Sequence, residues 1–394
     1  MDLRGTAIVF KKEIRDLFRD KKTLITSIII PLVIFPIMFG LMGRGIDSST
    51  KKVTENLKIS VRDEGKSSFY EFIKTVPNIN IMDSEDLKKD VQDGKIYLGV
   101  IIPADFDKVI ADGKSADLRI IYDDASQSSS MAQEMIQSIV DEYSKEIVKS
   151  RLASRGMDVS ILEPVKVTEE IVAKEKTSFA KIMLSMMLPL LLIIYATSTP
   201  IAAAVDLGAG EKERGTLEPL LTTQTSRMNL LFGKFFAITL MGIIGIVSSL
   251  AGLGVSMKLT PGLFGGEGGL TIKFGALLLI GLVTILLTMV FASLELAISI
   301  YARSFKEAQT YLSPLTIIGM AAAYGTYMLD VKNAGLMMFN IPIVNISLII
   351  KELINGIQNP THLGITFIWS IVYVALSIMF ARYMFTREEV IFRT

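Results

Sequence analysis

Residues 274–301 read FGALLLIGLVTILLTMVFASLELAISIY, with a single charged side chain, that of Glu295. A helix rises about 1.5 Å per residue, so about 20 residues cross the ~30 Å hydrocarbon layer of a bilayer. A soluble protein would have to cover such a helix on every side, whereas a bilayer accepts it directly. The run therefore predicts a membrane-spanning helix.

Five further apolar runs have a similar length, and 50% of the 394 residues are hydrophobic. The first run follows a basic segment, as in a signal peptide, but no small-residue cleavage site ends it, so we expect it to be retained. The sequence predicts an α-helical polytopic membrane protein with six transmembrane helices. The predicted spans are 23–43, 180–205, 229–257, 274–301, 310–329 and 363–385.

The distribution of Lys and Arg predicts the orientation. The leader to residue 22 carries seven, the loop 206–234 four, the loop 302–309 two and the tail from Arg382 three, whereas the two opposite short loops carry two each. Because basic loops stay in the cytoplasm, both termini and the loop 206–228 are expected there, including the tail 386–394. The predicted location is the cell membrane, and a disulfide-free outer region suits a bacterial cell.

The leader 1–22 is predicted to be an amphipathic helix lying on the cytoplasmic membrane surface. Ala7, Phe10, Ile14 and Leu17 recur at helical spacing among its basic residues. A soluble leader helix is the alternative.

The polar block 44–179 is predicted to form an extracellular α/β domain between spans 1 and 2, since it is long enough for its own core. Its β-branched runs predict strands, and Ser84 is expected to cap a helix that Gly94 ends. The expected strands are 57–61, 79–82, 96–102 and 118–122, and the expected helices are 69–75, 84–93, 104–112 and 128–155.

Composition excludes several kinds of chemistry. The chain has no cysteine and one histidine, His362, so thiolate catalysis and His- or Cys-rich metal sites are not expected. Gly233-Lys234 lacks the remaining residues of a phosphate-binding loop. A net charge of +1 indicates no nucleic-acid partner. We expect neither catalysis nor a bound cofactor in this chain by itself.

The charged segment 206–228 lies between two apolar spans. Gly215 permits a sharp reversal, and residues 216–221 can form a short helix with Leu217, Leu220 and Leu221 as an apolar ridge for a partner's groove. A solvated connector is an equally good interpretation.

Polar residues inside or near the spans are candidates for transport chemistry. A buried carboxylate such as that of Glu295 costs about 2.5–3.5 kcal/mol, so it should meet protein, water or a cation. It is a candidate cation ligand or proton exchanger, or it pairs with Arg303 or with an amide of the helix bundle. Asn340 and Asn345 are weak candidates for Na⁺ ligands, as are the hydroxyls of 197–199, which helix-kink chemistry at Pro200 explains equally well.

Small residues predict close helix packing, within or between protomers. Gly242, Gly245, Ser249 and Gly252 share one face of span 3, and Gly319 and Ala323 one face of span 5. The segment 338–358 is too short to span and is expected to dip into the outer leaflet or lie on it.

Three motifs resemble the ABC-2 type transporter permeases, and the likeness extends over essentially the whole chain. Residues 210–221 read GEKERGTLEPLL, residues 302–311 ARSFKEAQTY and residues 11–23 KKEIRDLFRDKKT. Within this family the chain most resembles the NatB-type sodium efflux permeases.

The resemblance implies a permease homodimer on two copies of a separate ATPase subunit, which would bind ATP and Mg²⁺. It implies Na⁺ as the substrate and a translocase in which this chain is not itself the enzyme. The implied second docking surface is Lys11, Lys12, Arg15 and Arg19. The implied ATPase-coupling residues are Glu211, Glu213, Arg214, Gly215, Thr216, Leu217, Glu218, Leu220 and Leu221.

Other functions stay open. An exporter of a drug, lipid or peptide would share the same architecture. A membrane sensor with an extracellular ligand-binding domain would usually end in a cytoplasmic effector domain, and a passive channel would need no docking helix.

Overall fold

The computed structural model describes residues 2–158, 179–264, 272–327 and 329–391. The chain divides into two compact units. Residues 1–40 and 173–394 form the first, here called the membrane unit, and residues 41–172 form the second, here called the insert unit. Each is described by itself.

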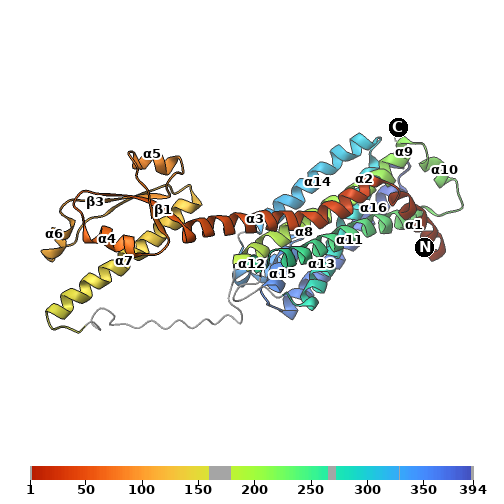
Figure 1. The fold of residues 1–394 in the computed structure, drawn as a ribbon. Coiled ribbons are helices and arrows are strands. Elements are labelled where there is room, and N and C mark those ends of the chain that lie inside the picture. Colours follow the sequence, from red (N-terminus) through yellow and green to blue (C-terminus); the bar gives the residue numbers. More distant parts are fainter. Residues whose placement is uncertain (1, 159–178, 265–271, 328, 392–394) are drawn as a thin grey trace. The chain divides into compact units, whose positions relative to one another are not determined.

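The membrane unit is helical (Figure 1). Its main helices are α1 (Leu3–Leu17), α2 (Lys21–Leu24), α3 (Ile30–Glu55, which continues into the insert unit), α8 (Phe179–Val205), α11 (Arg227–Leu259), α13 (Phe274–Tyr301), α14 (Phe305–Gly325), α15 (Val344–Ile354) and α16 (Pro360–Thr386). Its short elements are η1 (Ile25–Ile29), η3 (Asp206–Gly210), α9 (Glu211–Glu213), α10 (Leu217–Leu221), α12 (Pro261–Phe264), η4 (Val331–Asn333), η5 (Leu336–Asn340) and α17 (Glu388–Ile391).

Five helical segments among the described residues are long and apolar enough to cross a membrane. They are Ile25–Gly45, Lys181–Glu213, Arg227–Leu259, Phe274–Tyr301 and Pro360–Thr386. The sixth predicted span, 310–329, falls on α14, a helix of 21 residues. Alanine, glycine and hydroxyl residues make up much of α14, which lowers its hydropathy. A sixth span stays a prediction.

Helices α8 and α13 form the centre of the bundle. Helix α13 packs against α8, α11 and α16, and α8 packs against α11 and α14. The two chain termini, α9 and α10 lie at the same end of this unit (Figure 1). The termini and the charged segment therefore share one end of the bundle, as the basic residues predict.

The predicted close packing of span 3 is confirmed, and it occurs within one protomer. A Cβ atom on Gly242 would lie 2.2 Å from Thr288 of α13, and one on Gly252 would lie 2.2 Å from the backbone oxygen of Leu32. These glycines let α11 approach its neighbours more closely than any side chain would allow.

Helix α15 is a buried element. The side chains from Asn345 to Ile354 are buried, and the helix packs against α8, α13 and α16. Of the two predicted placements of 338–358, lying on the outer leaflet is therefore wrong for this helix, because η5 and the turn before α15 direct it into the bundle. That it dips into the outer leaflet stays a prediction.

The leader helix also packs differently from the prediction. Its buried residues are Thr6, Val9, Glu13 and Leu17, and Val9 meets the backbone position of Gly233 on α11. Phe18 ends the helix earlier than residue 22, and Lys21 begins a separate turn. The inner face of α1 thus rests on α11, and its place on the membrane surface stays a prediction.

The insert unit holds a four-stranded sheet in the order β2-β1-β3-β4. Its central strands, β1 (Leu57–Asp63) and β3 (Leu98–Ile102), are parallel, β2 (Ile79–Ile81) is parallel to β1, and β4 (Arg119–Tyr122) is antiparallel to β3. Helices α4 (Ser68–Thr75), α5 (Leu87–Gln92), α6 (Phe106–Ala111) and α7 (Gln127–Ser154) accompany it.

The predicted strands and helices of this unit are confirmed, with small shifts at their ends. The clearest correction concerns Ser84, which does not cap α5. Asp86 caps it, because its carboxylate accepts from Lys88 N and Lys89 N, while the Ser84 hydroxyl donates to Asp90. Gly94 ends the helix with a φ of 72°, as predicted.

Replacing Gly252 with alanine should lower the thermal unfolding temperature of the detergent-solubilised protein by several degrees, because overpacking costs about 1–3 kcal/mol. Gly254→Ala is the matched control, since a Cβ there meets nothing within 4 Å on the same helix. Equal melting temperatures for both variants would contradict the close contact with Leu32.

Candidate functional site

The charged segment begins where α8 ends. The π-helical turn η3 follows α8 directly, α9 follows η3, and Gly215 reverses the chain with a φ of 66° before α10. Ser226 then caps α11 by accepting from Asn229 N. The predicted reversal at Gly215 and the short helix after it are confirmed.

Four charged side chains from three elements form a compact ion network, here called the charge network. The Lys234 ammonium of α11 lies 3.1 Å from Glu13 of α1 and 2.6 Å from Glu211 of α9. The Lys12 ammonium lies 3.0 Å from each of the same two carboxylates. Two carboxylates and two ammonium groups thus balance each other.

The charge network is buried on its inner side. The side chains of Lys234, Glu13 and Glu211 are 0%, 1% and 4% exposed, whereas that of Lys12 is 43% exposed. Burial lowers the pKa of Lys12, but the Glu211 and Glu13 carboxylates raise it by more, so the net shift is upward. Lys12 remains charged and closes the network towards solvent.

Such a network joins the three elements firmly. Removing one partner from a buried ion pair leaves an uncompensated charge and costs about 3–5 kcal/mol. The Lys234 ammonium also donates to the carbonyl of Leu207 in η3, at 3.0 Å. Helices α1, α9 and α11 and the turn η3 are thereby tied together.

Side chains of α9 also form hydrogen bonds with the ends of neighbouring helices. Lys212 Nζ donates to the carbonyls of Ile300 at the end of α13 and of Val390 in α17, both at 2.7 Å. Glu213 accepts from Phe305 N at the start of α14, at 2.7 Å. A displacement of α9 would therefore be transmitted to α13 and α14.

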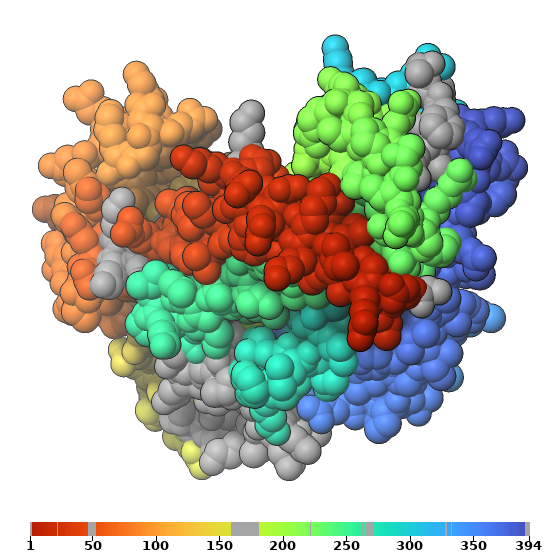
Figure 2. Space-filling view, turned by 90° about the vertical axis from the view of Figure 1, so that its right-hand side faces the viewer, coloured from red at the N-terminus to blue at the C-terminus, as the bar shows by residue number. Residues whose placement is uncertain are grey.

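A cleft of about 430 Å³ lies between α1 and this segment. Asp16 lines it from α1, and Arg214, Thr216 and Leu220 line it from the other side. Arg214 is held by Asp206, with its Nη1 atom 2.8 Å from the carboxylate. Figure 2 shows the N-terminal helices in red, close to the green segment that carries α9 and α10.

The structure divides the predicted coupling residues into two groups. Glu211 and Leu217 are buried, so they support the segment from inside, because the charge network holds Glu211 and the chain covers Leu217. Leu220 is partly buried, and the Leu221 side chain lies outside the described residues. The exposed members are Glu213, Arg214, Gly215, Thr216 and Glu218.

The predicted second docking surface is exposed as well. Lys11, Lys12, Arg15 and Arg19 all lie on the outer side of the leader region. Lys12 differs from the others because its ammonium belongs to the charge network. The exposed residues of the predicted coupling segment and of the predicted second docking surface, without Lys12, are here called the coupling surface. They are Lys11, Arg15, Arg19, Glu213, Arg214, Gly215, Thr216 and Glu218.

Sequence reasoning missed Glu13 and Lys234 as site residues. Each carried a signal: Glu13 occupies the helical stripe of Thr6, Val9 and Leu17, and Lys234 lies inside an otherwise apolar run. A charge on an apolar face predicts a buried partner. Nothing in the sequence indicates which partner, since these residues are 221 positions apart.

The candidate Na⁺ ligands are not gathered into one site. Both Glu295 oxygens are buried with no hydrogen-bond partner among the described residues, so the alternative in which Glu295 pairs with Arg303 or with a bundle amide is wrong. The side-chain oxygen Oδ1 of Asn340 accepts from Trp369 Nε1, and Oδ1 of Asn345 accepts from Ile346 N. Among the described residues, no group of three or more His, Cys, Asp and Glu could hold a metal ion.

The hydroxyls of Thr197 and Ser198 are used inside α8. Both donate to the carbonyl of Ile194, at 3.0 and 2.6 Å. Thr199 instead packs against Gly245 of α11. These contacts favour the explanation from helix structure and packing over an ion site.

A bundle of helices long and apolar enough to span a membrane, with a charged segment bonded to the helix ends, is typical of a polytopic membrane protein. The comparisons with known proteins identify its family. Residues 21–379 match the family model described as "ABC-2 family transporter protein". The chain belongs to this family and is an ABC-2 type transporter permease subunit.

Two bacterial relatives are similar to the chain. The "ABC transporter permease protein NatB" of Bacillus subtilis (strain 168) is 28% identical over 97% of this chain and 98% of its own length. The "Probable multidrug ABC transporter permease YbhS" of Escherichia coli (strain K12) is 24% identical over 60% of each chain. Membership of an ABC permease family implies an ATPase component as partner.

Replacing Lys234 with methionine should lower the free energy of unfolding by about 3–5 kcal/mol, because Glu13 and Glu211 lose their buried counter-ion. Adding Glu13→Gln to that variant should cost less than the sum of the two single changes, since Lys12 and Glu211 then remain as one balanced pair. Thermal unfolding in detergent measures both effects. Lys11→Met, on the exposed side of α1, is the control; a loss there equal to that of Lys234→Met would argue against the network.

Proposed function

We propose that this chain is the permease through which a separate ATPase drives export of a substrate. The observation that carries the proposal is the charge network, because it connects the coupling surface to α1, α9 and α11. A partner pressing on that surface would move these elements as one body rather than bend a loose loop.

The path for this force continues into the bundle. Lys212 and Glu213 connect α9 to the ends of α13 and α14, while η3 joins it to α8 without a break. ATP-driven closure of the partner would then tilt α8, α13 and α14 relative to the rest of the bundle. Such rigid-body motion is a usual way to alternate access to a site.

The orientation and assembly are part of the same proposal. The excess of Lys and Arg at the end with both termini supports a cytoplasmic position for the coupling surface and an extracellular position for the insert unit. A permease homodimer on two ATPase copies, with ATP and Mg²⁺ bound by the ATPase, follows from the family resemblance.

Sodium is the substrate that the NatB-type resemblance favours, and Glu295 is its best candidate ligand or proton carrier, since both its oxygens are buried without a partner. An organic substrate is the second candidate. A large apolar cavity between α13, α14, α15 and α16 favours it, as does the similarity to a relative named a multidrug permease.

Reversing two charges on the coupling surface, with Glu218→Lys and Arg15→Glu together, should abolish co-purification with the ATPase. Both side chains are exposed, so thermal stability should change little. Lys88→Glu on the exposed side of α5 is the control. Undiminished assembly of the double variant would refute the proposed docking surface.

If sodium is carried, inverted membrane vesicles containing both subunits should take up radioactive sodium when ATP is added. Glu295→Gln should reduce this uptake about tenfold, an estimate that assigns the carboxylate about 1.4 kcal/mol. Ser293→Ala, a buried change on the same helix, should leave it unaltered. No sodium uptake with an active ATPase would exclude sodium, and full uptake by Glu295→Gln would exclude this carboxyl.

A further inference from the structure

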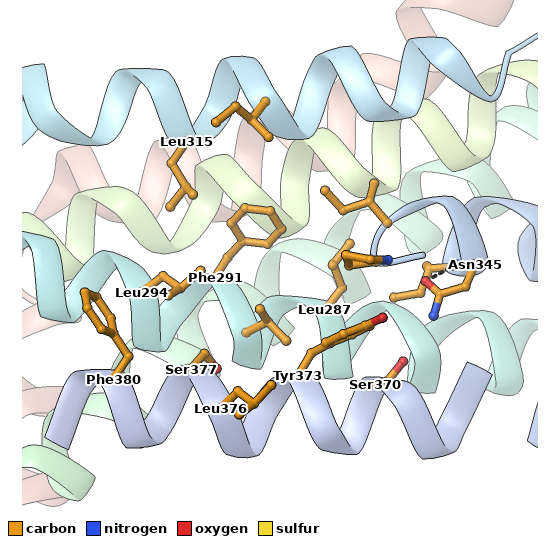
Figure 3. A pocket seen from close by; sticks show the side chains of 15 residues that line it. Leu287, Phe291, Leu294, Leu315, Asn345, Ser370, Tyr373, Leu376, Ser377 and Phe380 are labelled. Atoms are coloured by element: carbon orange, nitrogen blue, oxygen red, sulfur yellow. Dashed lines mark hydrogen bonds between the residues drawn. The ribbon is translucent and has the colours of Figure 1, made fainter. Parts of the chain in front are cut away.

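The largely apolar cavity in the membrane unit has a volume of about 370 Å³. Helices α13, α14 and α16 and the start of α15 form its walls (Figure 3). None of its lining residues is charged. Pockets for small organic ligands usually measure about 300–1,000 Å³ and are lined mainly by apolar side chains, so the cavity is large enough to hold one.

Most of the cavity wall consists of hydrocarbon side chains. Leu287, Phe291 and Leu294 of α13 face Leu315 of α14 and Phe380 of α16 across it. Such walls would desolvate a charged group without offering it a counter-ion. They suit an acyl chain or a ring system.

One end of the cavity is polar. Figure 3 places Asn345, Ser370 and Tyr373 together at that end, away from Phe380. The side-chain nitrogen of Asn345 and the hydroxyl of Ser370 are buried and have no hydrogen-bond partner among the described residues. A buried polar group without a partner is unfavourable, so a ligand that pairs with these groups would remove that cost.

The backbone beside this end is strained. Ile343, which lines the cavity, has a φ of 70° and a ψ of −49°, and Val344 N donates to the carbonyl of Pro342 at 2.8 Å. This is a γ-turn in its rare, positive-φ form, in a β-branched residue that seldom adopts it. Strain of this kind clusters at ligand sites, and here the turn places Asn345 in the cavity wall.

The cavity is flanked by exposed apolar side chains. Ile318, Leu376 and Phe380 line it and are 60%, 53% and 42% exposed. Leu376 and Phe380 lie on the candidate span α16 and Ile318 lies on α14, so a ligand reaching the cavity past them would come from the acyl-chain region of the bilayer.

We propose that this cavity binds an uncharged amphiphile with one apolar tail. The head group of the amphiphile would accept a hydrogen bond from the side-chain nitrogen of Asn345, and it would donate to or accept from the Ser370 hydroxyl. The tail would lie between α13 and α16 towards Phe380. The same cavity supports the organic substrate considered under the proposed function, but binding at this site needs neither the ATPase nor transport, so the two can fail separately.

Equilibrium binding to the purified full-length permease in nanodiscs, without any ATPase, tests the proposal. The probe is 1-lauroylglycerol, which has an apolar tail, an ester carbonyl and hydroxyls. Ser370→Ala should weaken its binding about fivefold, the loss expected for one hydrogen bond of about 1 kcal/mol. Dodecyltrimethylammonium, with a similar tail and a fixed charge, should bind at least about tenfold more weakly, because the walls carry no anion.

Ser249→Ala is the matched control, since it removes another buried hydroxyl without a described partner, on α11 and outside the cavity. Leu315→Trp, which fills the cavity, is a second variant in case the polar end is needed for folding. Unchanged binding in both Ser370→Ala and Leu315→Trp, or equal binding of the cationic probe, would overturn the proposal. A second permease copy covering this face would appear as binding that is absent until the dimer dissociates, and would equally overturn it.

Discussion

The ion pairs that Lys234 makes with Glu13 and Glu211 hold the coupling end of the membrane unit together. Each of the three side chains would be costly to bury alone, and together with Lys12 they form a neutral group. The leader helix can therefore dock on α11, and the start of the charged segment can stay close to the bundle. Without this charge balance, burying Glu13 beneath α1 would leave an uncompensated carboxylate, and α9 would keep only its contacts with α13, α14 and α17.

Small residues are the second feature that holds the membrane unit together, because they determine how closely its helices approach one another. Gly242 and Gly252 bring α11 against α13 and against the backbone of α3, and Gly208 in η3 packs on Ser299 of α13. The buried charges and these tight contacts lie along the same helices. A displacement of the coupling surface would therefore displace the packed helices of the interior. Closely packed helices move as rigid bodies more readily than they deform.

The two candidate sites divide the membrane unit by chemistry. The coupling end is charged and lies with both termini, whereas the cavity between α13, α14, α15 and α16 is apolar with a small polar end. Helices α13 and α14 contact both: Lys212 and Glu213 hold their ends, and Phe291 and Leu315 line the cavity. A displacement of α9, as the proposed function requires, would therefore reach the walls of the cavity through two helices.

The sequence by itself determined five of the six predicted spans, the strands and helices of the insert unit, the reversal at Gly215 and the family. These follow from local hydropathy, turn residues and short motifs, which depend on neighbours along the chain. Only the tertiary structure decided that Glu211 and Leu217 point inwards, that Glu13 meets Lys234, that Glu295 does not pair with Arg303, and that α15 is buried beside a cavity. These facts depend on contacts between residues far apart in the chain, and hydropathy and charge at a single position do not say which distant partner will satisfy them.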